Sequence, residues 1–147
     1  MTIILLDTGV AGQLVAPQPP VELQDWLVGV ISRGRHVFLP EIVDYELRRE
    51  FLRALPSRVP VLDALPERGC EYLPITTAAM HQAAAFWARL RHEARPTAHN
   101  HALDADCILA GQAFEAAASE RRPVRVATLN VRHLARLVDA ALWTDIS

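Results

Sequence analysis

The stretch Ile3-Ile4-Leu5-Leu6-Asp7 decides the fold of this chain. Four consecutive apolar residues, two of them β-branched, are typical of a strand buried on both faces, as in a parallel sheet covered by helices. Asp7 ends this run directly. In parallel sheets the ligand crevice lies at the carboxyl ends of the strands, so the acid stands where a functional residue is expected.

Predicted strands and helices alternate along the rest of the chain. Gly9 and Gly12 loosen the segment after the first strand, and the prolines at 17–20 break it. Further strands are expected at 36–40, 72–75, 124–128 and 141–143, and helices at 22–31, 42–55, 61–65, 77–91 and 103–118. Residues 95–101 are expected to form a loop, and Pro74 assigns the 72–75 strand to a sheet edge. This alternation predicts an α/β fold with a mainly parallel sheet covered on both faces.

Composition excludes several classes of function. The 147 residues are 51% hydrophobic and 22% charged, which is typical of a globular chain. All 15 basic residues are arginines. Without lysine there is no Schiff-base chemistry, no lysine general base and no Walker-type phosphate loop. The formal net charge of -2 argues mildly against a nucleic-acid partner.

Cysteine usage and hydropathy bear on the compartment. Cys70 and Cys107 form no CxxC pair, and two thiols make no disulfide framework, so a reducing cytoplasm is the simple interpretation. No apolar run approaches the roughly 18 residues that a transmembrane helix needs. The apolar N-terminal run is too short for a signal peptide. We therefore expect no membrane partner.

Five polar residues are predicted to gather at the carboxyl edge of the sheet. They are Asp7, Glu46, Asp104, Asp106 and Asn130. Clustered carboxylates repel one another unless a cation neutralises them, and hard oxygen ligands select Mg²⁺ or Mn²⁺. A magnesium ion so held keeps several waters and can orient a phosphate. The cluster therefore predicts metal-assisted phosphodiester hydrolysis.

Each of these residues also has a purely structural interpretation. Asp7 could cap the following turn, and Glu46 could be a surface acid paired with an arginine. Asp104 could be the N-cap of its helix, Asp106 a first-turn acid favoured by the helix dipole, and Asn130 a turn residue. These interpretations explain each residue singly, but not why all of them fall at one edge.

Four stretches of the chain together resemble a known family. They are 5–9 (LLDTG), 40–49 (PEIVDYELRR), 103–113 (LDADCILAGQA) and 126–134 (VATLNVRHL). In this order and spacing they look like the motifs of PIN-domain nucleases, in particular of VapC-like toxins, and the resemblance covers essentially the whole chain. It implies one PIN-like domain over residues 1–147, a three-layer α/β/α sandwich. It also implies a Mg²⁺-dependent endoribonuclease, the toxin of a type II toxin–antitoxin pair, with a cognate antitoxin and a homodimer as further expectations.

The resemblance also assigns roles to the acidic residues. Asp7, Glu46 and Asp106 match the family's acids and would hold the metal, with Asn130 at a position that is often aspartate. Asp104 is an extra acid beside Asp106, either a fourth ligand or only a helix cap. Because asparagine contributes no charge, the number of metal ions stays open. Thr8 resembles a hydroxyl residue that commonly follows the first acid, where it could help position a metal-bound water.

Other interpretations remain beside this one. The main alternative is a catalytically weak or inactive PIN-like module that binds a protein partner or RNA. A receiver-like module is excluded because it needs a phosphate-contacting lysine. His99 and His101 could bind Zn²⁺ together with Asp104, although two solvated loop histidines are the simpler interpretation.

The remaining features of the sequence concern core packing and the balance of acids and arginines. Cys107 is expected to pack in the core, and Phe86 and Trp87 to belong to a core or a dimer face. Without the four acids of the predicted site, 13 acids face 15 arginines. Arginine forks can hold an RNA backbone, because they match phosphates bidentately. The composition is therefore compatible with RNA as the substrate.

Overall fold

The computed structural model describes residues 1–93 and 100–147, with the side chains of 100–102 left out. Its sheet has the order β3-β2-β1-β4-β5, and every neighbouring pair is parallel. The strands are β1 (Ile3–Leu6), β2 (Val37–Pro40), β3 (Cys70–Leu73), β4 (Val124–Thr128) and β5 (Ala140–Leu142). The predicted parallel sheet is thus confirmed, and β3 lies at an edge as Pro74 indicated.

The first strand is the centre of the sheet. All four of its residues are buried, and it pairs with β2 through Ile4 opposite Val37 and with β4 through Leu5 opposite Val126. A continuous apolar run is what a strand with neighbours on both sides and helices on both faces requires. The residue that follows it, Asp7, is therefore placed in the middle of the carboxyl edge.

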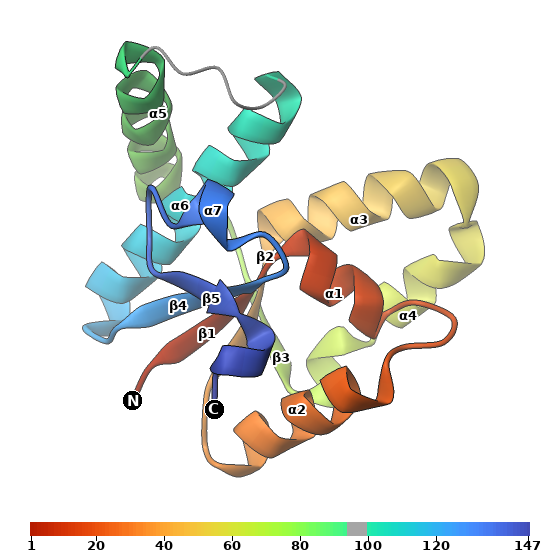
Figure 1. The fold of residues 1–147 in the computed structure, drawn as a ribbon. Coiled ribbons are helices and arrows are strands. Elements are labelled where there is room, and N and C mark those ends of the chain that lie inside the picture. The colour runs from red at the N-terminus through yellow and green to blue at the C-terminus, as the bar shows by residue number, and fades with distance from the viewer. Residues whose placement is uncertain (94–99) are drawn as a thin grey trace.

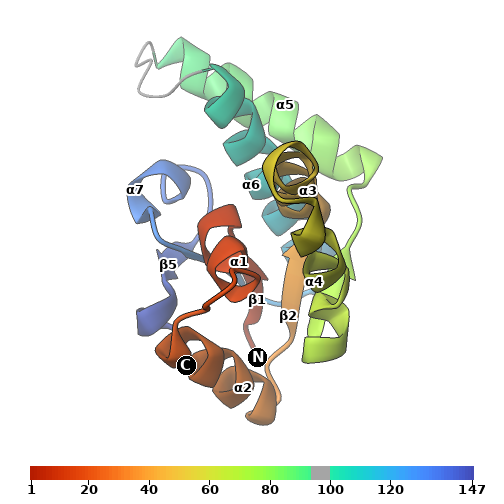
Figure 2. The ribbon, with the colours of Figure 1, turned by 90° about the vertical axis from the view of Figure 1, so that its right-hand side faces the viewer.

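Helices cover both faces of the sheet (Figure 1). They are α1 (Thr8–Leu14), α2 (Val21–Ser32), α3 (Glu41–Ala54), α4 (Val59–Asp63), α5 (Thr77–His92), α6 (Asn100–Glu120) and α7 (Val131–Leu134). The helices α1 to α4 lie on one side of the sheet, and α5 and α6 lie together on the other (Figure 1). Figure 2 shows α5 and α2 at opposite ends of the molecule. This is the expected three-layer α/β/α arrangement.

The expectation of an irregular segment after the first strand is wrong. Residues 8–14 form α1, and Asp7 is its N-cap. The two glycines serve close packing here. A Cβ atom at Gly9 would lie 3.1 Å from Cδ1 of Leu129, and one at Gly12 would lie 3.3 Å from Cδ2 of Leu47. The low helix propensity of glycine is offset by this close approach and by the cap.

Helices α5 and α6 pack against each other more closely than any other two helices. Thr76 caps α5, with Oγ1 accepting a hydrogen bond from the Ala79 amide at 3.0 Å. In α6, a Cβ atom at Gly111 would lie 2.3 Å from the carbonyl oxygen of Ala79. Glycine is thus required at this position, because no side chain fits between the two backbones.

Three further boundaries differ from the sequence expectation. The helix α6 begins at Asn100, so residues 100 and 101 are not loop, while 95–99 fall outside the described residues. Strand β3 covers 70–73 and ends before Pro74, because proline cannot donate to the ladder. Strand β5 begins one residue early, at Ala140. Both cysteines are free and buried, and within the described ranges no helix is long and apolar enough to cross a membrane.

Candidate functional site

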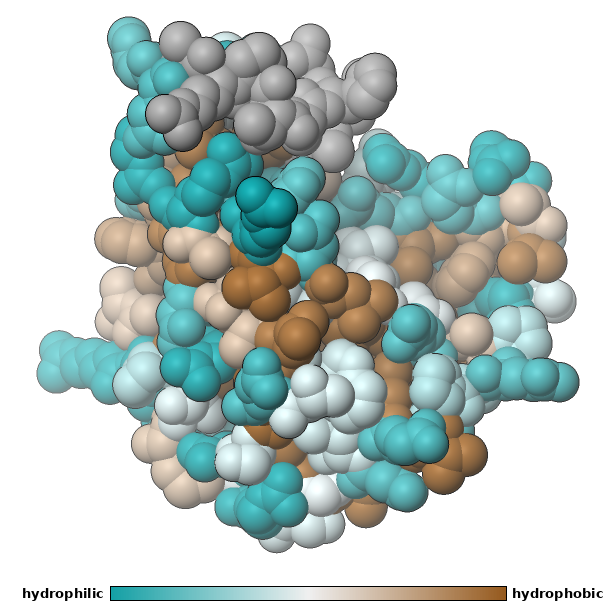
Figure 3. Space-filling model, viewed as in Figure 1, coloured by the Kyte–Doolittle hydropathy of each residue, from teal (hydrophilic) through white to brown (hydrophobic). Residues whose placement is uncertain are grey.

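Three carboxylates lie at the carboxyl edge of the sheet, near enough for Asp106 to sense the charges of the other two. Asp7 follows β1 directly, and Glu46 lies in the second turn of α3, which begins as soon as β2 ends. Asp106 lies in the second turn of α6, the helix that leads back to the amino end of β4. Figure 3 shows that, from this side, the surface is set back between the lobe formed by α5 and α6 and the lobe formed by α3. The topology thus places Asp7, Glu46 and Asp106 at the same edge of the sheet.

Asp7 is fixed through both of its carboxylate oxygens. Oδ1 accepts a hydrogen bond from the Thr8 amide at 2.7 Å, and Oδ2 accepts one from the Thr128 hydroxyl at 2.6 Å. Thr128 is fully buried, and its Oγ1 in turn accepts from the Asn130 amide at 3.0 Å. The expected capping role of Asp7 is therefore present. Each oxygen still keeps a lone pair, since a carboxylate offers about four acceptor sites.

Glu46 is linked to Asp7 through Thr8, which forms a hydrogen bond with each acid. The Thr8 hydroxyl donates a hydrogen bond to Oε1 of Glu46 at 2.8 Å. Arg49, one turn further along α3, places Nη2 3.9 Å from Oε2 of Glu46, a long contact for an ion pair. Glu46 is thus held by a neutral hydroxyl, and its charge is only weakly compensated by the arginine.

Asp106 is the acid whose ionisation is most strongly perturbed. Burial, followed by the negative charges of Asp7 and Glu46, raises its pKa from 3.8 to about 6, against the opposing charge of His133. Nδ1 of His133 lies 3.6 Å from Oδ2 of Asp106. A carboxyl group that is partly desolvated beside two others is costly to ionise, and a cation would relieve that cost.

The chemistry of these side chains fits a hard divalent cation. Asp7, Glu46 and Asp106 present carboxylate oxygens, which Mg²⁺ and Mn²⁺ prefer. The three side chains lie further apart than the ligands of a formed metal site. Among the described residues, no three histidine, cysteine, aspartate or glutamate side chains converge closely enough to hold a metal ion. The acids therefore feel one another's charge without forming a closed set of ligands.

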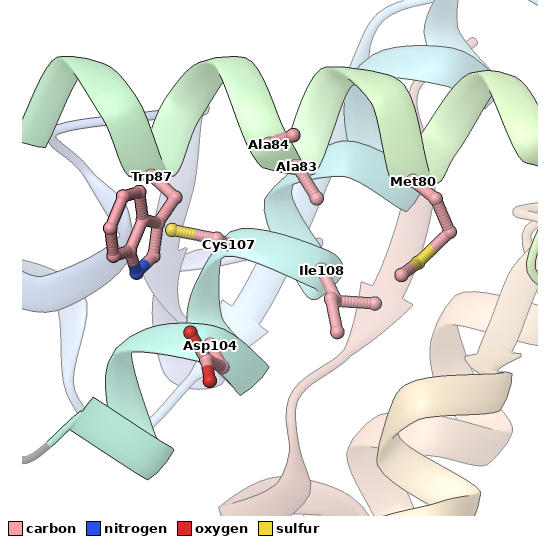
Figure 4. A pocket seen from close by; sticks show the side chains of 7 residues that line it. All are labelled: Met80, Ala83, Ala84, Trp87, Asp104, Cys107 and Ile108. Atoms are coloured by element: carbon pink, nitrogen blue, oxygen red, sulfur yellow. The ribbon is translucent and has the colours of Figure 1, made fainter.

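Asp104 lies apart from this cluster. Because α6 begins at Asn100, Asp104 is not its N-cap; it stands in the second turn and is exposed. Residues two apart in a helix point about 200° apart around its axis, so Asp104 and Asp106 face different sides of α6. Asp104 lines a pocket between α5 and α6 together with Trp87 (Figure 4). The structure does not bring it to the other three acids.

Asn130 is close to the cluster through its backbone alone. Its side chain is exposed and makes no capping bond to α7, while its amide is bound to Thr128. The structure thus links Asn130 to Asp7 through the Thr128 hydroxyl.

Sequence reasoning missed two residues of this site. Thr128 is the last residue of β4, and the only signal in the sequence was a hydroxyl at the carboxyl end of a predicted strand. His133 lies in the short helix α7, which the expected secondary structure omitted, so nothing placed its ring near Asp106.

The remaining sequence expectations have mixed outcomes. His99 lies outside the described residues, and His101 belongs to α6 with a side chain that is not described. Cys107 and Phe86 are buried in one apolar cluster, as expected for core packing. Trp87 is 39% exposed and lines the pocket.

Comparisons with known proteins were made at the level of sequence and of structure. Neither a protein-family model nor a curated protein matches the sequence. Among solved structures, a chain of VapBC2 from Rickettsia felis bound to a DNA fragment from its promoter matches with a TM-score of 0.75 at 16% identity, over 97% of this chain and 99% of that one. A chain of DNA-bound VapBC from Salmonella typhimurium matches with a TM-score of 0.74 at 21% identity, over 97% and 99%.

A third solved structure agrees with the first two. A chain of FitAcB from Neisseria gonorrhoeae matches with a TM-score of 0.70 at 22% identity, over 98% of this chain and all of that one. At such identities the likeness concerns the fold, and it extends over nearly the whole length of each chain. This chain therefore has the PIN-like fold of the VapC type that its sequence motifs resemble.

Proposed function

We propose that this chain is a Mg²⁺-dependent endoribonuclease, with Mn²⁺ as a possible substitute, that hydrolyses RNA phosphodiester bonds. The observation that carries the proposal is the raised pKa of Asp106, which burial and the charges of Asp7 and Glu46 together produce. A carboxyl group that is partly buried beside two other acids, as Asp106 is, is costly to ionise in a purely structural role. Its ionisation becomes favourable where a divalent cation binds.

The residues of the cluster have distinct parts in this proposal. Asp7, Glu46 and Asp106 would hold the metal, which supplies charge stabilisation at the phosphate and a more acidic water. Thr128 and the Thr8 amide keep the Asp7 carboxylate in one orientation, and the Thr8 hydroxyl does the same for Glu46. Asp104 is not brought to this set, and Asn130 is linked to Asp7 through the Thr128 hydroxyl. Because the three acids do not converge, we expect them to draw together when the metal binds.

Side chains beside Glu46 support RNA as the substrate. The guanidinium carbon of Arg49 lies 5.2 Å from the centroid of the Tyr45 ring, and Tyr45 is 56% exposed. An arginine and an exposed aromatic ring next to the acids offer a contact to phosphate and a surface for a base. With no lysine in the chain, arginine is the side chain that supplies fixed positive charge.

The fold supports a place for this activity in a toxin–antitoxin pair. The solved structures that share the fold are of VapBC and FitAB. We therefore propose that the chain is the toxin, that a cognate antitoxin controls it, and that it acts as a homodimer. A small neighbouring gene that encodes a DNA-binding protein and forms a complex with this chain would support that part of the proposal.

Cleavage of a labelled RNA pool, with Mg²⁺ or Mn²⁺ and with or without chelator, tests the enzymatic part. The variants are Asp7→Asn and Asp106→Asn. Asparagine caps a helix about as well as aspartate, so Asp7→Asn keeps α1 while it removes the charge. Glu120→Gln is the matched control, since Glu120 is an exposed acid at the far end of α6. We expect metal-dependent cleavage by the native chain and the control, and none by the other two variants.

The alternative is a PIN-like module that binds a partner without cleaving RNA. The open arrangement of the acids and the neutral Asn130 favour this alternative. Metal binding without cleavage of any RNA would support it and overturn the nuclease proposal. Equal cleavage in chelator, or full activity of both asparagine variants, would show that the cleavage does not depend on the acid cluster.

A further inference from the structure

A cavity of about 400 Å³ opens between α5 and α6, and no part of the proposed mechanism uses it. Its lining side chains come from both helices: Met80, Ala83, Ala84, Trp87, Asp104, Cys107 and Ile108. Figure 4 shows the Trp87 indole and the Asp104 carboxylate near one end and the Met80 and Ile108 side chains at the other. The cavity therefore combines a flat aromatic wall, apolar packing and a single charged acceptor.

These three components are those that proteins use to bind an unstacked nucleobase. The indole of Trp87 can stack on a base, and the small side chains of Ala83 and Ala84 leave room for a flat ring beside α5. Asp104, when ionised, is an acceptor only, and its two oxygens can receive two parallel N–H bonds. Arg91 already lies against Trp87, with its guanidinium carbon 4.9 Å from the ring centroid. The Trp87 ring thus already contacts one flat cationic group, and it also faces the cavity.

The position of the cavity relative to the acid cluster is also suitable. Asp104 and Asp106 are two residues apart on α6, a rise of about 3 Å along the axis. They point to different sides of the helix, one toward the cavity and the other toward Asp7. Ile108 lies on the wall of the cavity and packs partly against the main core. A base in the cavity would thus lie across α6 from the acids, about 10 Å (one helix diameter) away, and would belong to a nucleotide near the one at the acids.

We propose that this cavity binds a guanine base of single-stranded RNA, near the phosphate that the acid cluster acts on. The proposal rests on the proposed ribonuclease function and adds base specificity to it. Guanine has two adjacent donors on one edge, N1–H and the 2-amino group, which match the two oxygens of a carboxylate. Adenine and cytosine pair one amino group with an acceptor on that edge, and uracil has one N–H flanked by two acceptors, so each would set an acceptor against Asp104.

Binding of short labelled RNAs to the Asp7→Asn variant, in chelator, tests this proposal apart from cleavage. The probes are oligouridylates that carry one central guanosine, inosine, adenosine or 7-deazaguanosine. Inosine keeps N1–H and lacks the 2-amino group, whereas 7-deazaguanosine keeps both donors. We expect the guanosine and 7-deazaguanosine RNAs to bind equally well, and about tenfold more tightly than the inosine and adenosine RNAs, because a bidentate pair discriminates bases by about that factor.

Two substitutions and a control separate the roles of the cavity residues. Asp104→Asn, added to Asp7→Asn, keeps the shape of the side chain and should abolish the preference of guanosine over inosine. Trp87→Leu should weaken all four RNAs by about tenfold, since stacking is indifferent to the base. Glu120→Gln should change neither. Circular dichroism and thermal unfolding of each variant confirm that the fold is retained.

Several outcomes would overturn the proposal. They are equal binding of the guanosine and inosine RNAs, a preference that survives Asp104→Asn, and no binding of any RNA. If the cavity instead receives a protein side chain, Asp104→Asn and Trp87→Leu would weaken a protein complex and leave the base preference unchanged. Failure of the ribonuclease proposal looks different, because the native chain would then cleave no RNA whatever these probes show.

Discussion

Two acids on the same helix have opposite surroundings. Asp44 is buried, and Arg48 binds it through two bonds of 3.0 Å, from Nε to Oδ2 and from Nη2 to Oδ1. The same guanidinium also binds Asp63 at 2.5 Å. Hydrogen bonds to Asp44 and then to Asp63 raise the pKa of Arg48 above its usual value. Two residues further along α3, Glu46 accepts its short hydrogen bond from a neutral hydroxyl, and its arginine contact is 3.9 Å long.

The two acids differ in how their charge is compensated. At Asp44 the buried charge is matched by a bidentate guanidinium, as buried charges require for stability. At Asp7 and Glu46 the short hydrogen bonds come from hydroxyls and a backbone amide, which orient a carboxylate without neutralising it, and Asp106 lies beside the His133 ring. These three acids are therefore the ones at which we propose that a cation binds.

The largest expected effect is on cleavage, in Glu46→Gln. The variant keeps an oxygen that can accept from Thr8 but loses the charge, so we expect RNA cleavage to fall by about a hundredfold or more. Glu50→Gln is the control, since Glu50 is an exposed acid on the same helix, paired with Arg53. Single-turnover cleavage rates measure both. Similar rates in the two variants would remove Glu46 from the site.

The next effect is on stability, in Arg48→Ala. Removing the guanidinium leaves Asp44 buried without its partner, and we expect the free energy of unfolding to fall by about 2 kcal/mol. This is below the usual cost of a broken buried pair because the Arg48 side chain is 34% exposed. Arg53→Ala, whose pair is exposed, should change stability by less than about 0.5 kcal/mol. Urea unfolding measures the difference, and an equal loss in both would contradict the distinction between the two acids.

A smaller effect is expected from Thr128→Val, which removes the hydroxyl bound to Asp7 with little change in shape. We expect cleavage and apparent Mg²⁺ affinity to fall by about ten- to a hundredfold, as for other residues that orient metal ligands. Thr128→Ser should restore both. Thermal unfolding at increasing Mg²⁺ gives the affinity independently of cleavage. If Val and Ser behave alike, the hydroxyl does not position Asp7.

The smallest effect is a gain in stability, in Asp106→Asn without metal. The pKa of Asp106 is raised from 3.8 to about 6 in the folded chain, so ionising this group destabilises the fold. The folded chain has its full stability below pH 3.8, where Asp106 is neutral, and loses part of it as the pH rises through 6. The variant stays neutral, so above pH 6 we expect it to be more stable than the native chain by about 1–2 kcal/mol.

Metal should reverse the order of stability of the native chain and the Asp106→Asn variant. Mg²⁺ stabilises whatever binds it in the folded state, so it should raise the unfolding temperature of the native chain and leave Asp106→Asn nearly unchanged. Thermal unfolding over a pH series, with Mg²⁺ and with chelator, measures both parts. A native chain that remains the less stable of the two in Mg²⁺ would contradict the role of Asp106 as a ligand.

The sequence predicted the parallel sheet and the place of Asp7 at its carboxyl edge because these depend on local pattern. The buried apolar run and the Asp7 that follows it can be identified without knowledge of the rest of the chain. The helix α1 was missed because glycine signals flexibility locally, whereas Gly9 and Gly12 are used here for contacts with Leu129 and Leu47. Those contacts join residues distant in sequence, and local propensity does not record them.

The roles of Asp104 and Thr128 could not be predicted for a related reason. The side of α6 on which Asp104 lies depends on where the helix begins, and helix starts are poorly defined without a cap signal. Thr128 becomes part of the site only through its bond to Asp7, which is 121 residues away in sequence. In both cases the missing information was the direction of a side chain.

The close contact at Gly111 determines the spacing between two helices that carry residues of the proposed site. An added methyl group would meet the carbonyl oxygen of Ala79 at 2.3 Å, so the distance between α5 and α6 has no room to adapt. The same helix carries Asp106 on one side and the proposed base pocket on the other. Gly111, a position with no side chain, thus sets the spacing between Trp87 of the proposed base pocket on α5 and the proposed metal ligand Asp106 on α6.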